Sequence, residues 1–188
     1  AEDLARLRDS ALPHVYVLGA GHVGRALANL FEHLPVHCVL VDTRPEEMAR
    51  NTAKVETRVS ALPEIEIWNA PADSAFIVLT HDHALDFLLT SAALERGDAA
   101  YVGMIGSATK RAKFKNWTHK NCDGQTIEHL NCPIGASGSR DKRPSVIAAF
   151  VAAEVMADLT SETTATAPLG AIEAPIAGTQ RDRKGIPA

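Results

Sequence analysis

Residues 14–24 read HVYVLGAGHVG, an apolar run followed at once by a glycine-rich turn. In a turn of this kind Gly19 permits a sharp change of direction after a strand, Gly21 lets the backbone approach a phosphate closely, and Gly24 lets the next helix pack against the sheet. The turn aims the positive end of a helix, with its unpaired N–H groups, at an anion. The pattern therefore predicts a Rossmann-like start to the fold, with a phosphate-binding turn.

A second apolar run, at 36–41, ends in Asp42. In dinucleotide-binding folds an acid at the end of the second strand accepts hydrogen bonds from a ribose hydroxyl, so Asp42 favours NAD over NADP if a dinucleotide binds. The strand, helix and second strand around the glycines make this pattern far more specific than the glycines alone.

Apolar periodicity along the rest of the chain predicts alternating strands and helices. We expect strands at 14–18, 36–42, 75–79 and 99–105, and helices at 3–10, 22–34, 44–50, 82–96, 107–118, 124–130 and 144–159. Residues 53–74 are ambiguous, with short strands expected at 54–58 and 65–68. Strands separated by helices predict an α/β fold, a Rossmann-like doubly wound parallel sheet with helices on both faces.

Residues 1–159 are expected to form one ligand-binding domain, because 188 residues with 46% hydrophobic residues suit a single compact domain and a tail. Residues 160–188 lack apolar periodicity, which predicts a tail that is flexible or docks on a partner. The helix expected at 144–159 is apolar over most of its circumference. We therefore expect it to be buried by the sheet and by a partner chain or the preceding segment, and we predict a homodimer.

Charge and composition weigh against two classes of partner. The formal net charge of −4 argues against nucleic acid. No apolar run approaches the length that spans a bilayer and no charged-then-apolar leader opens the chain, so we expect a cytoplasmic protein without a membrane contact.

Cys38, Cys122 and Cys132 form no CxxC pair, and we interpret Cys38 and Cys132 as buried thiols rather than nucleophiles.

The ligand crevice of a doubly wound sheet lies outside the carboxyl ends of its strands, near the point where the strand order reverses. That rule brings together segments that are far apart in the sequence: the glycine turn, Asp42 with Arg44, residues 80–83, and Gly106 with Ser107. A polar pocket is expected where they meet.

Ser107 is expected to cap a helix whose first turn carries Lys110 and Arg111. Cations in the first turn oppose the helix dipole, so a phosphate at the Ser107 cap would explain them. Removal of both cations is then expected to stabilise the empty protein slightly. The alternative is a solvated basic face, because Lys113 and Lys115 continue the charge.

Residues 80–83 read THDH and have three interpretations. His81 and His83, together with His22 of the glycine turn, contact a ligand as hydrogen-bond donors. Alternatively, Asp82 caps the following helix, or the imidazoles bind a metal, although a tetrahedral site needs more ligands than this segment supplies. We expect ligand contact, with no metal site and no catalytic residue.

Five motifs follow one another in order: GAGHVG at 19–24, VDTRP at 41–45, THDHALD at 80–86, YVGMIGS at 101–107 with Lys110 and Arg111, and CPIG at 132–135. Together they resemble the carboxyl-terminal Rossmann-like half of the xanthine dehydrogenase accessory factor (XdhC/CoxI) family, from about residue 13 to 159. Two features depart from the family pattern. Typical members have an amino-terminal half without a counterpart here, and the usual glycine-rich continuation after CPIG is replaced by ASGSRDK at 136–142.

The resemblance implies a protein that binds molybdenum cofactor (molybdopterin) and helps to mature or insert it into molybdenum hydroxylases of the xanthine dehydrogenase type. This is a chaperone-like role with no established reaction of its own, so an enzyme is not expected. The implied partners are that hydroxylase and a sulfur-donating cysteine desulfurase.

The glycine turn and the resemblance agree on a phosphate, which molybdopterin carries. The expected contacts are Gly19, Gly21, His22 and Gly24 at a phosphate turn, Asp42 as a hydroxyl or ring-nitrogen acceptor beside Arg44, His81 and His83 as pocket donors, and Ser107, Lys110 and Arg111 as a second anion contact. Two other classes stay open. A NAD-dependent oxidoreductase would use the same turn, and so would a nucleotide-binding regulatory domain.

Overall fold

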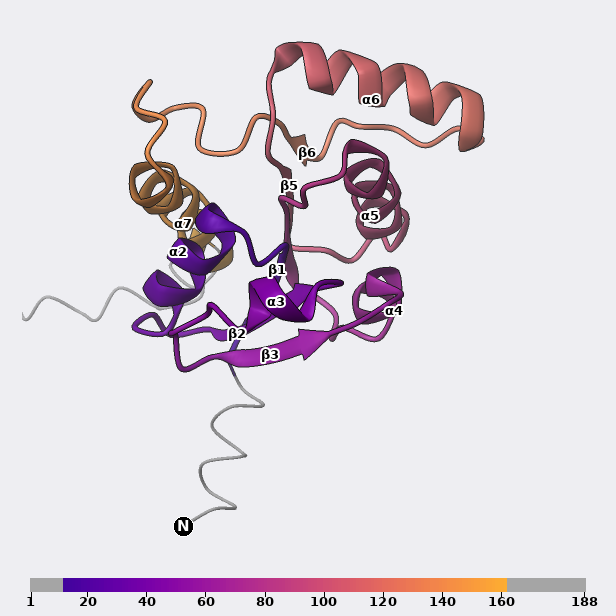
Figure 1. The fold of residues 1–188 in the computed structure, drawn as a ribbon. Coiled ribbons are helices and arrows are strands. Elements are labelled where there is room, and N and C mark those ends of the chain that lie inside the picture. The colour runs from indigo at the N-terminus through magenta and orange to yellow at the C-terminus, as the bar shows by residue number, and fades with distance from the viewer. Residues whose placement is uncertain (1–11, 162–188) are drawn as a thin grey trace, which may run out of the picture.

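Six parallel strands form one sheet in the order β3-β2-β1-β4-β5-β6 in the computed structural model, which describes residues 12–161 (Figure 1). The strands are β1 (His14–Leu18), β2 (His37–Asp42), β3 (Glu56–Val59), β4 (Ala75–Val78), β5 (Tyr101–Met104) and β6 (Leu130–Asn131). Strands β4 and β5 are buried throughout, and β1 and β2 are buried apart from their first residues, as parallel strands covered on both faces require. Leu18 of β1 is level with Val41 of β2 and Val78 of β4, so these three strands end at one edge.

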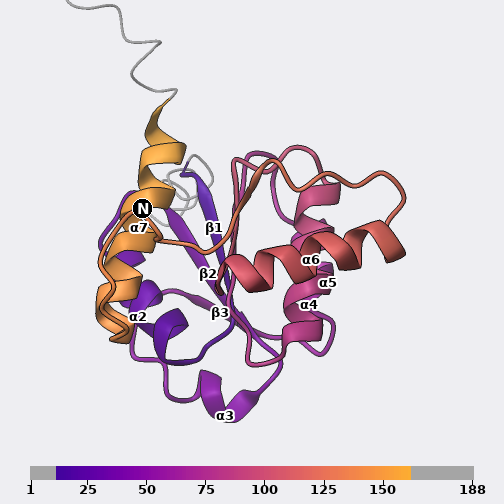
Figure 2. The same ribbon diagram turned by 90° about the horizontal axis from the view of Figure 1, so that it is seen from above.

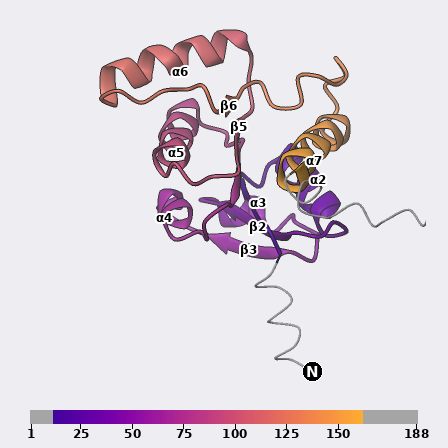
Figure 3. The same ribbon diagram turned by 180° about the vertical axis from the view of Figure 1, so that it is seen from behind.

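Helices cover both faces of the sheet (Figures 1 and 2). They are α2 (His22–Phe31), α3 (Pro45–Met48), α4 (Pro63–Trp68), α5 (His83–Glu95), α6 (Ala108–Asn121) and α7 (Pro144–Ser161). Helices α2 and α7 pack together on one face, and α4 and α5 lie on the other, which is also visible from behind (Figure 3). The observed layers and strand order confirm the predicted Rossmann-like fold.

Each face of the sheet has its own apolar core. On the α2 and α7 face, Leu27 and Phe31 are packed with Val151 and Val155. On the α4 and α5 face, Ile67, Phe76 and Leu89 pack with Phe114 of α6. Burial of a side chain of this size contributes about 1.5–3 kcal/mol, so these two cores hold the strand ends, and the loops that follow them, in place.

Two expected elements are wrong. Residues 65–68, expected as a strand, belong to helix α4. Pro63 opens that helix, where its missing N–H costs nothing, and Glu64 and Glu66 stabilise the positive end of the helix dipole. Residues 124–130, expected as a helix, form turns and irregular backbone up to His129, and Leu130 begins β6. Gln125 anchors this segment, because it accepts a hydrogen bond from the Ser91 hydroxyl and donates one to the Ser91 carbonyl oxygen.

Helix α7 differs from expectation in two respects. It runs to Ser161, past the expected domain boundary at 159, whereas the expected helix at 3–10 and residues 162–188 of the tail lie outside the described residues. By length and composition α7 is also long and apolar enough to cross a membrane, which corrects the expectation that no segment approaches that length. Its contacts with α2 and β5 make it a helix of this domain.

Candidate functional site

The strand order reverses at β1, which has β2 on one side and β4 on the other. A small crevice of about 10 Å³ lies at the carboxyl ends of these strands. It is lined by Leu18, Gly19, Val41, Asp42, Thr43, Pro63, Thr80, His81, Leu85 and Leu89. The fold therefore brings the glycine turn, the end of β2 and the segment after β4 together, as the sequence predicted, in the place where ligands bind this class of sheet.

The three glycines of the turn have different surroundings. Gly19 has φ +130°, and a Cβ there would lie 2.4 Å from the carbonyl oxygen of Leu79. A Cβ on Gly24 would lie 1.8 Å from the carbonyl oxygen of Gly19, so both positions need glycine for the fold itself. A Cβ on Gly21 meets no atom of the described residues within 4 Å. Among residues 12–161, nothing in the protein accounts for glycine at position 21.

Gly21 is the N-cap of α2, and no side chain of the described residues caps this helix end. The first turn of α2 contains no acidic residue, and His22 is exposed. Arg25 donates a hydrogen bond to the carbonyl oxygen of Ala20 and forms an ion pair with Glu47 at 2.7 Å, so its charge is already balanced. The start of α2 thus has N–H groups without a side-chain cap or a neighbouring acid, which is the arrangement that binds anions.

Asp42 lies at the end of β2 with a side chain that is 3% exposed. One of its oxygens accepts hydrogen bonds from the Arg44 amide at 2.8 Å and from Arg44 Nε at 3.0 Å. The other oxygen accepts from the Ala20 amide at 2.6 Å and from Arg44 Nη2 at 3.1 Å. Burial raises the pKa of Asp42, but the hydrogen bonds from Arg44 and Ala20 outweigh it and lower the pKa overall.

The Asp42 carboxylate is therefore already occupied by the glycine turn and by Arg44. A ribose diol would have to displace Arg44 to reach it, which removes the reason to expect a preference for NAD. Ligand contacts by Asp42 and Arg44 stay predictions.

The segment after β4 contains the side chain that caps helix α5. Asp82 accepts a hydrogen bond from the Ala84 amide at 2.8 Å, so the capping interpretation is confirmed for this residue. His81 lines the crevice, and both His81 and His83 are exposed. Within residues 12–161, no three His, Cys, Asp or Glu side chains are arranged to hold a metal ion. Contact of the two imidazoles with a ligand stays a prediction.

Lys110 has a partner that the sequence did not suggest. Its ammonium donates a hydrogen bond to Asp86, which is fully buried in α5, and another to the carbonyl oxygen of Ile105 at 2.9 Å. Asp86 also accepts from the amide and hydroxyl of Thr80, at 2.8 and 2.7 Å. The Lys110 charge is thus balanced inside the protein. Its position in the first turn of α6 is therefore explained without a phosphate, and it no longer indicates a second anion site.

Arg111 also binds within the protein. Its guanidinium donates to the carbonyl oxygen of Leu130 and, at 3.2 Å, to that of Ile127, and so ties α6 to the segment before β6. Ser107 caps α6 as expected, accepting from the Lys110 amide at 3.2 Å. The expectation that removal of both cations stabilises the empty protein is therefore wrong, because it would leave the buried carboxylate of Asp86 without its counter-charge.

One signal in the sequence points to Asp86. The buried residues of α5 include Leu89, Thr90 and Ala93, and Asp86 stands on the same helix face. An acid on an apolar face is uncommon without a partner. A cation from another segment was therefore to be expected nearby, although helical spacing alone does not say which one.

The cysteines lie as interpreted from the sequence. Cys38 is buried in β2, and burial raises its pKa to about 12. Cys132 is buried just after β6, and burial raises its pKa even though Lys110 and Arg111 lie near enough to oppose the shift. Both features are those of unreactive thiols.

Three comparisons bear on this site. A family model described as the XdhC Rossmann domain matches residues 15–155. A solved structure described as a xanthine dehydrogenase from Bacillus halodurans is similar with a TM-score of 0.66 at 20% sequence identity, covering 84% of this chain and 45% of that one. This chain therefore spans less than half of that protein, and the likeness shows the fold alone. The search of curated proteins finds no match.

Proposed function

The chain belongs to the XdhC Rossmann domain family, and from this membership we propose that it is an accessory protein that binds molybdenum cofactor. The proposed role is to hold this cofactor during the maturation of molybdenum hydroxylases of the xanthine dehydrogenase type. The observation that carries the proposal is Gly21, a glycine at an uncapped helix start, two residues after Gly19 of the crevice, whose missing side chain leaves open space.

The residues present fit the phosphate of molybdopterin. The N–H groups at the start of α2 supply hydrogen-bond donors and a positive dipole end, and the absence of an acid from the first turn leaves this charge uncompensated. His81, which lines the crevice together with Gly19, adds a donor for the polar edge of a pterin. The cofactor supplies its molybdenum chemistry in the enzyme that receives it, while this chain binds and orients the cofactor.

The state of Asp42 weighs against the alternative of a NAD-dependent oxidoreductase. The acid that would bind the ribose of NAD already accepts two hydrogen bonds on each oxygen. Titration of the protein with NAD tests this alternative directly. The proposal predicts no saturable binding of NAD at concentrations on the order of 1 μM.

Gly21→Asp and Gly21→Asn test the proposed function as an isosteric pair. Both side chains cap α2 in the extended backbone conformation that Gly21 already has, so both variants should melt at or slightly above the temperature of the parent. Both occupy the N–H groups that the phosphate needs, and the carboxylate of Gly21→Asp also repels the phosphate. The cofactor that co-purifies with the protein, quantified by pterin fluorescence, should fall in both variants and fall furthest in Gly21→Asp.

Asn116→Asp is the control for an added charge, because Asn116 is exposed on α6 and is not among the residues that line the crevice. It should leave cofactor retention near that of the parent. Retention of a full complement of cofactor by Gly21→Asp, with an unchanged melting temperature, would contradict the proposal.

A further inference from the structure

Asp86 and Lys110 form a buried ion pair that lies beside the crevice but does not line it. Asp86 is fully buried and Lys110 is 9% exposed. A buried pair of this kind is often no more stabilising than apolar residues of the same size, because both charges lose their hydration. Its place at the carboxyl ends of β4 and β5 therefore suggests a task beyond stability.

On one side, the pair fixes the segment after β4. The carboxylate of Asp86 accepts hydrogen bonds from both the amide and the hydroxyl of Thr80. The backbone of this segment lies directly against the glycine turn, since a Cβ on Gly19 would be 2.4 Å from the carbonyl oxygen of Leu79 and 3.1 Å from the Thr80 nitrogen. The position of Asp86 therefore determines where the segment after β4 presses on the glycine turn.

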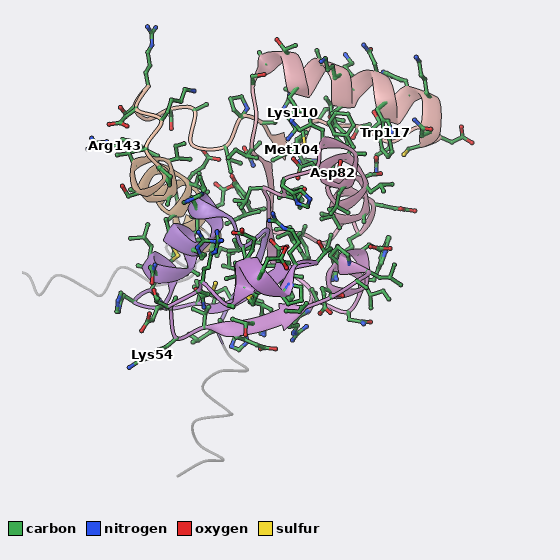
Figure 4. The ribbon with its side chains drawn as sticks, viewed as in Figure 1. Lys54, Asp82, Met104, Lys110, Trp117 and Arg143 are labelled. Carbon is green, nitrogen blue, oxygen red and sulfur yellow. The ribbon has the colours of Figure 1, made fainter. Side chains whose placement is uncertain are left out.

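On the other side, the pair fixes the segment after β5. Lys110 donates to the carbonyl oxygen of Ile105, and its stem passes so close to Gly106 that a Cβ there would lie 2.5 Å from Lys110 Cδ. Gly106 has φ +158°, a conformation that favours glycine, so the loop and the lysine fit each other. Lys110 lies on the side of α6 that faces the rest of the domain (Figure 4).

We propose that Asp86 and Lys110 are positioning residues, which hold the segments after β4 and β5 at a fixed distance from the glycine turn. Neither residue touches the ligand. The pair acts through Thr80, which lines the crevice beside Gly19, and it ties this segment to Ile105 and Gly106 of the neighbouring segment after β5. This inference rests on the proposed function for its ligand, but its geometric part is measurable without one.

Two double variants separate the two connections. The first, called the apolar pair, is Asp86→Leu with Lys110→Met. It replaces both charges by apolar side chains, which avoids an unpaired buried charge and removes both connections. The second, called the Asn variant, is Asp86→Asn with Lys110→Met. It keeps an acceptor for Thr80 and breaks only the connection to the segment after β5. Lys113→Met is the control, because Lys113 is an exposed lysine on the same helix.

Hydrogen exchange of the ligand-free proteins is the first measurement. In the apolar pair, the amides of Thr80, Gly19 and Ala20, which are all hydrogen-bonded in the parent, should exchange at least about tenfold faster, while Val15 and Val17 inside β1 keep their rates. In the Asn variant the faster exchange should be confined to residues 105–108. Lys113→Met should match the parent throughout.

Cofactor retention is the second measurement, and the apolar pair should retain at least about tenfold less than the parent at a similar melting temperature. Unchanged exchange at Gly19 and Ala20 in the apolar pair overturns the inference, and so does faster exchange spread evenly through β1, which would show a general loss of stability. If the apolar pair does not fold, unchanged exchange at 105–108 in the Asn variant overturns it. A parent without cofactor refutes the proposed function, whereas the exchange data still decide the inference.

Discussion

Asp42 connects the end of β2 to the glycine turn through the Ala20 amide, and Arg44 closes over it from outside. Because its pKa in the folded protein is lowered, Asp42 stabilises the fold at pH values above the unfolded pKa of about 3.9. That stabilisation is lost as the pH falls through the lower, folded pKa. The residue thus contributes to folding and to the shape of the site at the same time.

Asp42→Asn should lower the free energy of unfolding by about 2 kcal/mol at pH 7, because hydrogen bonds to a charged acceptor are lost. The difference from the parent should shrink as the pH falls below about 4, since the parent then loses the same charge. Denaturant unfolding at a series of pH values measures this difference. Glu128→Gln, an exposed carboxyl group far from the turn, is the control, and a difference that stays constant with pH would refute the role given to Asp42.

The three thiols should differ in reactivity. Burial raises the pKa of Cys38 to about 12 and also raises that of Cys132, whereas Cys122 is only half-buried beside Ser91. A thiol reagent at pH 8 should therefore modify Cys122 first and leave the other two unmodified until the protein unfolds. Mass mapping of the labelled peptides gives the order. Rapid labelling of Cys132 in the native protein would show that it is a reactive thiol and not a buried turn residue.

At the scale of elements, the contact between β1 and α2 depends on Gly24. A Cβ at that position would lie 1.8 Å from a backbone oxygen, which cannot rotate away. Gly24→Ala should therefore lower the free energy of unfolding by about 3 kcal/mol or more, whereas Gly21→Ala should change it by no more than about 1 kcal/mol. Thermal unfolding of the two variants side by side checks this contrast. Equal losses would mean that Gly21 is also required for the fold.

The elements that could be predicted from the sequence are those with long, uniform patterns. The buried runs of β1, β2 and β4 and the glycine turn have no competing interpretation, and their place at one edge follows from parallel pairing. Residues 65–68 belong to helix α4 and not to the expected strand. Ile65 and Ile67 alternate with acidic residues over too few positions to distinguish the two-residue period of a strand from the 3.6-residue period of a helix. The segment at 124–130 is held by side-chain bonds from another helix, which local propensity does not contain.

The candidate site was predictable in its location but not in its electrostatics. Lys110 and Arg111 have the same spacing whether they bind a ligand, face solvent or pair inside the protein. Only the packing of α6 against α5 shows that Lys110 shares a buried face with Phe114 and pairs with Asp86. Long side chains reach partners on other elements, so their contacts depend on tertiary structure more than on local sequence.

At the scale of the whole molecule, the side of α7 that faces away from α2 is the surface on which the predicted homodimer depends. Ala148, Val151, Ala152 and Val155 face α2, but Ala149 and Ala153 are exposed, as is Phe150 at 38%. The segment before α7 covers part of this side, since a Cβ on Gly138 would collide with the Phe150 ring. A homodimer through the remaining apolar surface stays a prediction.

Ala153→Arg should convert such a dimer to a monomer without loss of the fold, because Ala153 is exposed within the domain. Sedimentation at micromolar concentration measures the mass, and circular dichroism monitors the fold. Lys115→Arg, on the opposite side of the molecule in α6, should leave the mass unchanged. A parent that sediments as a compact monomer would contradict the predicted dimer.

The most direct test of the proposed function is mass spectrometry of the small molecules that the purified protein releases on denaturation. The proposal predicts a molybdopterin species carrying a phosphate in the parent, and its depletion in Gly21→Asp prepared in parallel. Release of a nicotinamide dinucleotide in its place, reduced by the same substitution, would contradict the proposal and assign the glycine turn to NAD or NADP.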